Sequence, residues 1–159
     1  MIEIEVPGRG TYRLKHLVLD VNGTIALDGQ LSQGVAKRLA ELRRSVEVHM
    51  LTADTQGRQQ VIDAQLGMKA VRITVGLFHK EAAQKASFVR KLGGESVCAI
   101  GNGVNDAGML REAKLAIAVL GEEGLAVETL TEADVVVPHI NAALDLLLNP
   151  LRLVATLRR

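Results

Sequence analysis

The sequence predicts an α/β fold with a mostly parallel sheet flanked by helices, and three observations support this prediction. Short apolar runs of strand length alternate along the chain with segments of helical period. The chain has 159 residues, 48% of them hydrophobic, which is enough for one self-sufficient core. No repeat, low-complexity tract or linker interrupts the pattern. We therefore expect a single Rossmann-like domain over residues 1–159.

The strand predictions follow the apolar runs in chain order. Residues Ile2–Val6 alternate strictly, so we expect a half-exposed edge strand that Pro7-Gly8-Arg9-Gly10 turns towards the next one. The other strands are expected at Leu14–Val21, Val46–Leu51, Val71–Val75, Val97–Ile100, Leu115–Val119 and Val135–Val137.

Helices are predicted between these strands. Ser32 is expected to cap the first helix, in which Val35, Leu39 and Leu42 fall at helical spacing and which ends near Ser45. Further helices are expected over Thr55–Leu66 with a stop at Gly67, over Lys80–Leu92, after Val104, and in the tail from Ile140 with a break at Pro150.

Composition excludes several classes of protein. Lys plus Arg number 19 against 18 Asp plus Glu, and Tyr12, Phe78 and Phe88 are the only aromatic residues, so we expect no nucleic-acid partner. The first residues lack the apolar core of a signal peptide, and no stretch is long enough for a membrane span. Cys98 is the only cysteine, which favours a reducing, cytoplasmic location.

Short polar residues and glycines follow three of the predicted strands, in the segments 20–24, 52–54 and 101–106. The carboxyl ends of parallel strands meet at one edge of a sheet, so these segments should lie together. Asp20 and Asp106 offer the oxygen ligands that Mg²⁺ prefers, and glycines with helix N-termini suit a phosphate. A lysine from the third helix would balance the charge. The pattern predicts a phosphoryl-transfer site.

These segments resemble the four ordered motifs of the haloacid dehalogenase superfamily. The motifs are DVNGTI at 20–25, LTADT at 51–55, a helix with a lysine, and GNGVNDAGML at 101–110. The resemblance covers most of the chain and is strongest to the phosphorylation domain of P-type ATPases. Small phosphatases without a cap domain are similar too.

The resemblance implies a role for each matching residue. Asp20 would be the nucleophile that forms an aspartyl-phosphate, Thr52 would hydrogen-bond the phosphoryl oxygens, and Lys85 rather than Lys80 would neutralise their charge. The implied catalytic residues are Asp20, Asn22, Thr52 and Lys85, the phosphate-binding residues Gly23, Thr52, Ala53 and Lys85, and the Mg²⁺ ligands Asp20, Asn22, Asn102 and Asp106.

Two residues depart from the pattern of the family. Its phosphatases usually carry a second aspartate two residues after the nucleophile, as general acid and base, where this chain has Asn22. An amide cannot exchange that proton. The fourth motif ordinarily begins with a metal-binding aspartate, where this chain has Asn102. We expect attenuated activity and weaker Mg²⁺ binding.

Spacing limits what the chain can contain. Asp20 and Thr52 are 32 positions apart, and Thr52 and Lys85 are 33 apart. This leaves room for one or two helices and a short flap, but not for a cap domain or an ATP-binding domain. We therefore expect a domain without a cap that is not an autonomous ATPase.

Two classes of function stay open. The chain is either a Mg²⁺-dependent phosphohydrolase or phosphotransferase acting on a small phosphorylated substrate or a phosphoprotein, or a catalytically inactive module. The inactive module would bind a phosphorylated ligand or a protein partner through the same residues.

Other residues receive no chemical role from the sequence. His16, His49, His79 and His139 are dispersed without ligand spacing, and Glu122-Glu123 is most simply solvated. The leucine-rich tail from Ile140 suggests a homo-oligomer, although it could equally pack on its own sheet.

Overall fold

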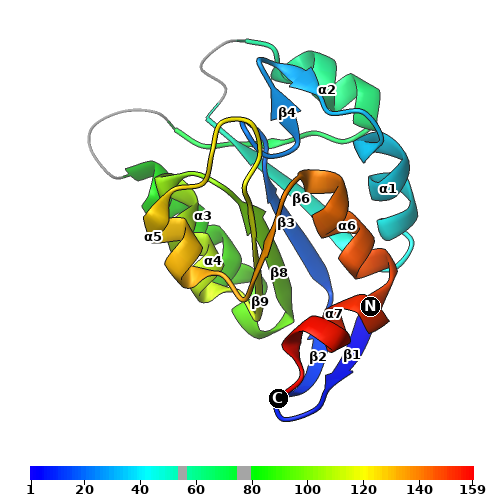
Figure 1. The fold of residues 1–159 in the computed structure, drawn as a ribbon. Coiled ribbons are helices and arrows are strands. Elements are labelled where there is room, and N and C mark those ends of the chain that lie inside the picture. The colour runs from blue at the N-terminus through cyan, green and yellow to red at the C-terminus, as the bar shows by residue number, and fades with distance from the viewer. Residues whose placement is uncertain (54–56, 75–79) are drawn as a thin grey trace.

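A computed structural model describes residues 1–53, 57–74 and 80–159 (Figure 1). In this part of the chain, six strands form a parallel sheet in the order β10-β9-β8-β3-β6-β7. The strands are β3 (His16–Asp20), β6 (Glu47–Thr52), β7 (Val71–Arg72), β8 (Val97–Gly101), β9 (Leu115–Val119) and β10 (Val135–Val137). The predicted mostly parallel sheet is confirmed.

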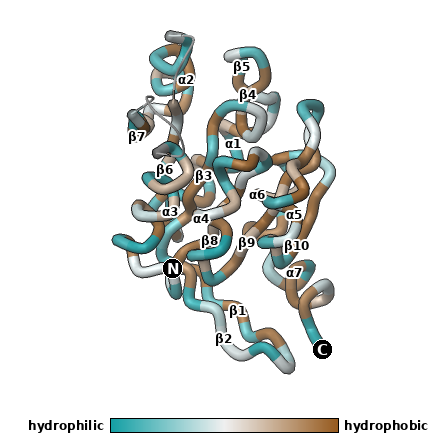
Figure 2. Tube along the Cα trace, turned by 90° about the vertical axis from the view of Figure 1, so that its left-hand side faces the viewer, coloured by the Kyte–Doolittle hydropathy of each residue, from teal (hydrophilic) through white to brown (hydrophobic). Residues whose placement is uncertain are grey.

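Helices cover both faces of this sheet (Figure 1). One face carries α3 (Lys80–Leu92), α4 (Ala107–Glu112) and α5 (Val127–Glu132), and the other carries α1 (Val35–Leu42) and α6 (Ile140–Leu148), with α2 (Gln59–Leu66) beside α1. Alternate residues of β3 supply both cores: Leu17 and Leu19 pack in the cluster with α1 and α6, and Val18 packs in the cluster with α3 and α4. Figure 2 shows hydrophobic residues gathered in the interior and hydrophilic ones in the loops and at the C-terminus.

The N-terminal region differs from the prediction. β1 (Ile2–Val6) has the expected burial alternation, but it pairs antiparallel with β2 (Gly10–Leu14) in a separate two-stranded sheet. The predicted strand Leu14–Val21 is thus divided, because Leu14 ends β2 and His16 begins β3. A second small hairpin, which the sequence did not predict, follows β3 and comprises β4 (Ala26–Leu27) and β5 (Gln30–Leu31).

The helices differ from the predictions at the start of α1 and in the presence of α5, and they agree with them at the end of α2. Ser32 does not cap α1: the N-cap is Gly34, at φ 86°, and no side chain caps this end. The short helix α5 was not predicted. Gly67 ends α2 as expected, at φ 59°, a left-handed conformation that glycine adopts without strain. The predicted start of α2 at Thr55 and the predicted end of β7 at Val75 lie outside the described residues. Short 3₁₀ turns span Gly94–Ser96 and Val104–Asp106.

The tail packs on its own core. α6 and α7 (Pro150–Leu157) meet at Pro150 with a bend of 101°. Leu144, Leu147, Leu153 and Leu157 are buried, whereas Leu151 is 83% exposed. Among the described residues, no single helix is long and apolar enough to cross a membrane. Together α6 and α7 reach the required length and hydropathy, but the bend separates them.

The carboxyl ends of β6, β3 and β8 lie side by side at one end of the molecule, which we call the rim (Figure 1). Asp20, Thr52 and Gly101 are the last residues of these three strands. Between β3 and β6 the described residues form only β4, β5 and α1, and between β6 and α3 they form only α2 and β7, which agrees with a domain without a cap.

Candidate active site

Asp20 lies at the centre of the rim, at the end of the central strand β3. Its side chain is nearly buried, with the residue 5% exposed. Oδ1 accepts a hydrogen bond from Nζ of Lys85 at 2.7 Å, and Oδ2 accepts one from Oγ1 of Thr24 at 2.9 Å. Both carboxylate oxygens are therefore oriented by fixed donors.

Lys85 reaches this carboxylate from α3 and is fully buried. Its Nζ also donates to Oδ1 of Asp106 at 2.8 Å and lies 3.8 Å from Oε1 of Glu81. One ammonium group thus joins the carboxylate at the end of β3 to the carboxylate of Asp106, which lies in the 3₁₀ turn after β8. Buried charges are tolerated when they are paired in this way.

The pKa values of the pair reflect burial and the shared charge. Burial and the neighbouring charge of Asp106 raise the pKa of Asp20 to about 7, although Lys85 and Thr24 act in the opposite direction. Burial alone would lower the pKa of Lys85, but the charges of Asp20 and Asp106 outweigh it and raise that pKa above its ordinary value. The lysine is therefore held in its charged form.

Asp106 also holds the glycine-rich loop that follows β8. Its Oδ2 accepts hydrogen bonds from the backbone N–H groups of Asn102 and Gly103, both at 3.0 Å. The carbonyl of Gly103 accepts a further bond from Oγ1 of Thr129 at 2.5 Å. The aspartate thus fixes the loop with one oxygen and orients Lys85 with the other.

Asn102 lies on the other side of Thr24. Its Oδ1 is 3.1 Å from Oγ1 of Thr24, and its Nδ2 donates to the carbonyl of Gly124 at 3.3 Å. A hydroxyl carries one proton, so Thr24 donates to Asp20 or to Asn102 at any one time. Thr24 is not among the site residues predicted from the sequence, although its place in the first motif was a signal that could have indicated it.

The remaining predicted residues lie at the same rim. Nδ2 of Asn22 donates to Oγ1 of Thr52 at 3.4 Å, which joins the ends of β3 and β6. Ala53 follows directly and is half-buried. The N–H of Gly23 donates to the carbonyl of Ala26 at 2.7 Å, so a phosphate would compete with that bond.

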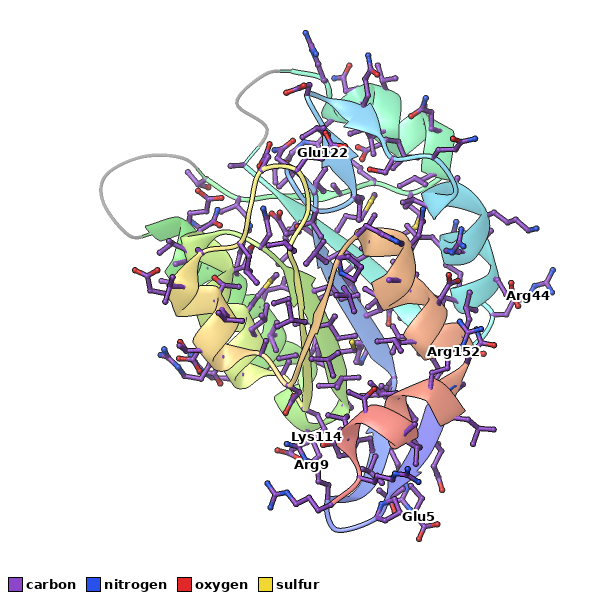
Figure 3. The ribbon with its side chains drawn as sticks, in the orientation of Figure 1. Glu5, Arg9, Arg44, Lys114, Glu122 and Arg152 are labelled. Carbon is purple, nitrogen blue, oxygen red and sulfur yellow. The ribbon has the colours of Figure 1, made fainter. Side chains whose placement is uncertain are left out.

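Glu123 is exposed, as the sequence indicated, and its carboxylate lies against the first motif. Gly23 has φ 79°, and a Cβ at this position would overlap the Glu123 carboxylate and approach Nδ2 of Asn102 to 3.0 Å. Glu123 belongs to the loop between β9 and α5, which reaches the rim end of the molecule; Figure 3 labels the adjacent Glu122 there. In the sequence, the polar segment that follows the predicted strand Leu115–Val119 could have indicated that Glu123 lies near the rim.

The donor atoms at the rim are oxygens of the kind that Mg²⁺ prefers. Oδ2 of Asp20 and Oδ1 of Asn102 both lie within hydrogen-bonding distance of the same hydroxyl, that of Thr24. Each oxygen of Asp106 already accepts from the protein, so this carboxylate would serve a cation through water. The predicted ligand residues therefore offer the oxygen atoms that suit Mg²⁺, and Asp106 would contact the ion through a water molecule.

Comparison with known proteins identifies the family. The model of haloacid dehalogenase-like hydrolases matches residues 5–114. An uncharacterised protein of Methanocaldococcus jannaschii is 52% identical over 64 residues, which are 40% of this chain and 69% of that protein. A copper-importing P-type ATPase of Enterococcus hirae, named as probable, is 33% identical over 112 residues, 69% of this chain but 15% of the ATPase.

The fold is also similar to that of solved phosphatases. The 3-deoxy-D-manno-octulosonate 8-phosphate phosphatase of Moraxella catarrhalis superposes with a TM-score of 0.66 at 18% identity, covering 87% of each chain. This structure contains magnesium, phosphate and the sugar acid. The matching fold, the ordered motifs and the family model agree, and the chain belongs to the haloacid dehalogenase-like hydrolases.

Proposed function

We propose that the chain is a Mg²⁺-dependent phosphohydrolase or phosphotransferase that acts through an aspartyl-phosphate on Asp20. The observation that carries the proposal is the carboxylate of Asp20, held at the end of β3 by Lys85 and Thr24. An isolated structural aspartate would not need a buried lysine that it shares with a second aspartate.

The reaction would proceed in two displacements. A carboxylate oxygen of Asp20 attacks phosphorus, a P–O bond to the carboxylate forms, and the P–O bond to the leaving group breaks. Water then attacks the same phosphorus and loses a proton to solvent, the P–O bond to Asp20 breaks, and inorganic phosphate and the free carboxylate of Asp20 are released. In a phosphotransferase, the hydroxyl of an acceptor replaces this water.

The surrounding residues would bind and orient the phosphoryl group. Lys85 would neutralise part of its charge, and the hydroxyl of Thr52 would donate to one of its oxygens. The backbone N–H of Ala53 would be a further donor, and that of Gly23 would become one if it exchanged its bond to the Ala26 carbonyl for the phosphoryl group. Bound Mg²⁺, held by Asp20, the Asn22 carbonyl, Asn102 and a water on Asp106, would screen the remaining negative charge.

We expect slow turnover because of the two asparagines. Asn22 already donates its amide hydrogen to Thr52, and it cannot transfer a proton to a leaving group or take one from water. Asn102 contributes a neutral oxygen where a carboxylate would attract the cation more strongly.

A small phosphorylated molecule or a phosphoprotein is the proposed substrate class. The phosphatase fold of the Moraxella protein supports the first. We propose a cytoplasmic location and no nucleic-acid partner, as expected from the composition. A catalytically inactive module that binds such a ligand is the alternative, and Asn22 is the specific observation in its favour.

Mass spectrometry after incubation with acetyl phosphate and Mg²⁺ tests the proposal. We expect one added phosphoryl group, sensitive to hydroxylamine, that disappears in Asp20→Asn. Beryllium fluoride should compete with it. Absence of any adduct on the wild-type chain, together with Mg²⁺-dependent binding of inorganic phosphate, would favour the inactive module instead.

A further inference from the structure

A second cluster of ligand-type side chains lies at the opposite end of the sheet from the rim. His16 is the first residue of β3, and Glu47 is the first residue of β6. The two residues are direct partners in the parallel ladder, and His49 follows Glu47 on the same face of β6. Strand pairing therefore brings together two histidines that are 33 positions apart in the sequence.

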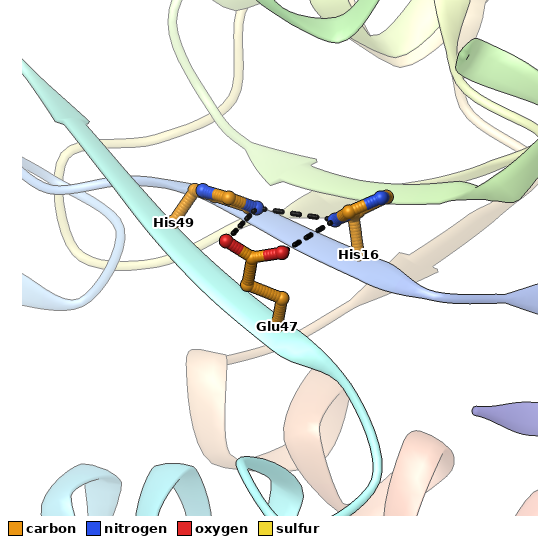
Figure 4. Close-up of side chains that lie close together, drawn as sticks. All are labelled: His16, Glu47 and His49. Carbon is orange, nitrogen blue, oxygen red and sulfur yellow. Dashed lines mark hydrogen bonds and ion pairs between the residues drawn. The ribbon is translucent and has the colours of Figure 1, made fainter. Parts of the chain in front are cut away.

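The three side chains converge on one point (Figure 4). Nδ1 of His16 lies 3.2 Å from Nε2 of His49. The Glu47 carboxylate faces both rings, with Oε2 at 3.5 Å from His16 and Oε1 at 3.8 Å from His49. Among the described residues, this is the group of histidine, cysteine and acidic side chains whose ligand atoms all lie within 4.8 Å of one another.

Hydrogen bonding alone satisfies this cluster poorly. One imidazole can donate to the other at 3.2 Å, but N–H···O bonds to a carboxylate are usually about 2.7–3.2 Å long, shorter than both distances to Glu47. In a tetrahedral Zn²⁺ site with bonds of about 2.0–2.2 Å, neighbouring ligand atoms are about 3.3–3.6 Å apart. The 3.2 Å between the two imidazole nitrogens and the 3.5 Å between Nδ1 of His16 and Oε2 of Glu47 are close to these separations, and one ligand atom from each of the three residues lies within 4.8 Å of the other two.

Burial and access also suit a metal ion. The side chains of His16 and His49 are 18% and 13% exposed, and the rings of His49 and of Phe88 in α3 form a T-shaped contact with centroids 5.4 Å apart. Glu47 is 67% exposed, so an ion and a water ligand could enter from its side.

We propose that Nδ1 of His16, Nε2 of His49 and the carboxylate of Glu47 form a binding site for Zn²⁺ or a similar divalent transition-metal ion. Two imidazoles and one carboxylate are typical ligands of such ions, whereas Mg²⁺ prefers oxygen alone. The ion would link the amino ends of the two strands whose carboxyl ends carry Asp20 and Thr52. The site does not depend on the phosphoryl-transfer proposal.

Titration of the purified chain with Zn²⁺, and separately with Co²⁺, tests this site. Millimolar Mg²⁺ in the buffer competes with these metals for the oxygen ligands of the rim. We expect about one equivalent of either metal to bind, with the visible absorption of tetrahedral Co²⁺. His16→Gln, His49→Gln and Glu47→Ala should each weaken binding by about tenfold or more, since even outer ligands contribute about 10–100-fold.

Two matched variants serve as controls. His139→Asn removes an imidazole elsewhere but can still cap α6, and Glu5→Ala removes an exposed carboxylate at the first hairpin (Figure 3). Both should bind Zn²⁺ as the wild type does. Because Glu47 is exposed, its variant should fold, and the rise in Tm that Zn²⁺ produces should be lost in it. Binding that is absent, or equal in the ligand and control variants, would overturn the proposal.

Discussion

Asn22 is the residue with the greatest expected effect on rate. It lies two positions after Asp20, and its amide Nδ2 faces Thr52 across the rim. A carboxyl group at this position could protonate a leaving group and then activate water, which an amide cannot do. The side chains have nearly the same shape, so the substitution changes chemistry with little change in packing.

Asn22→Asp should therefore raise turnover of a phosphate ester with a poor leaving group by about 10²–10⁴-fold. Esters with good leaving groups should gain less, because they need no acid in the first step. Steady-state assays on both ester types measure the difference. Asn22 and Asn102 precede glycines and can deamidate, so peptide mass spectrometry must verify each preparation. No gain on any ester would argue against catalysis.

Lys85 is the residue on which the rim most depends for stability. It is the buried cation between Asp20 and Asp106, so Lys85→Met would leave two buried carboxylates without it. We expect unfolding free energy to fall by about 3–5 kcal/mol at pH 7, measured by urea denaturation. The exposed Lys37→Met is the control and should change it by less than about 0.5 kcal/mol. Combining Lys85→Met with Asp20→Asn should restore part of the loss.

At the scale of elements, the loop between β9 and α5 brings a carboxylate to the rim. Glu123 lies against Gly23 and close to Asn102, where the first aspartate of the fourth motif is missing. Its negative charge would attract the proposed Mg²⁺ at the rim, and solvent would screen part of that attraction.

Glu123→Gln should therefore weaken Mg²⁺ binding by about threefold to tenfold, measured by calorimetry at low ionic strength. The exposed Glu128→Gln in α5 is the matched control and should leave the affinity unchanged. Equal affinities in both variants would mean that the loop carboxylate does not act on the cation.

The pairing of α1 with α6 rests partly on one ion pair. Nε and Nη2 of Arg38 donate to the two oxygens of Asp145 at 2.7 and 3.0 Å. The hydrogen bond from Arg38 lowers the pKa of Asp145. A lowered pKa means that the carboxylate stabilises the fold above its ordinary pKa of about 3.9, and that this contribution is lost as the pH falls below it.

Asp145→Asn should consequently lower the Tm at pH 7, and the difference from the wild type should shrink as the pH falls below about 3.9. Thermal unfolding followed by circular dichroism across this range measures it. The exposed Glu41→Gln in α1 provides the comparison, with little difference at any pH. A Tm difference for Asp145→Asn that persists at low pH would point to packing instead of charge.

At the scale of the whole molecule, α7 joins the two ends of the chain. The N–H of Arg159 donates to the carbonyl of Pro7 at 3.0 Å, and Leu153 is fully buried between the tail and the core. Most leucines of the tail therefore pack within one copy of the chain. Leu151 is the exception and is the residue on which oligomerisation through the tail would depend.

Leu153→Ala should lower the unfolding free energy by about 2–5 kcal/mol, while Leu151→Ala should change it by less than about 0.5 kcal/mol in a monomer. Urea denaturation measures both. Light scattering at high micromolar concentration tests the predicted homo-oligomer directly. If it forms through the tail, Leu151→Ala should dissociate it, and a wild-type monomer at that concentration would reject it.

Much of the fold could be predicted because its causes are local. Apolar runs of five residues between helical segments indicate buried parallel strands, as at Leu115–Val119. Gly67 ends α2 through its own left-handed backbone conformation, which does not depend on the surface against which the helix packs. The separate N-terminal hairpin could not be predicted, since alternation in Ile2–Val6 specifies a half-buried strand but not its partner. Ser32 is not the cap of α1 because a turn follows it, in which its carbonyl accepts from the N–H of Val35. The helix begins only after Gly34.

The sequence by itself determined the order of the motifs and the chemical types of side chain at the strand ends. Only the tertiary structure decided that Lys85 joins Asp20 to Asp106, that Thr24 lies between Asp20 and Asn102, and that Glu123 reaches Gly23. It also paired His16 with His49. Spacing along a chain reports on neighbours within one helix or strand, whereas these contacts depend on strand order and register, which arise only when distant segments pack together.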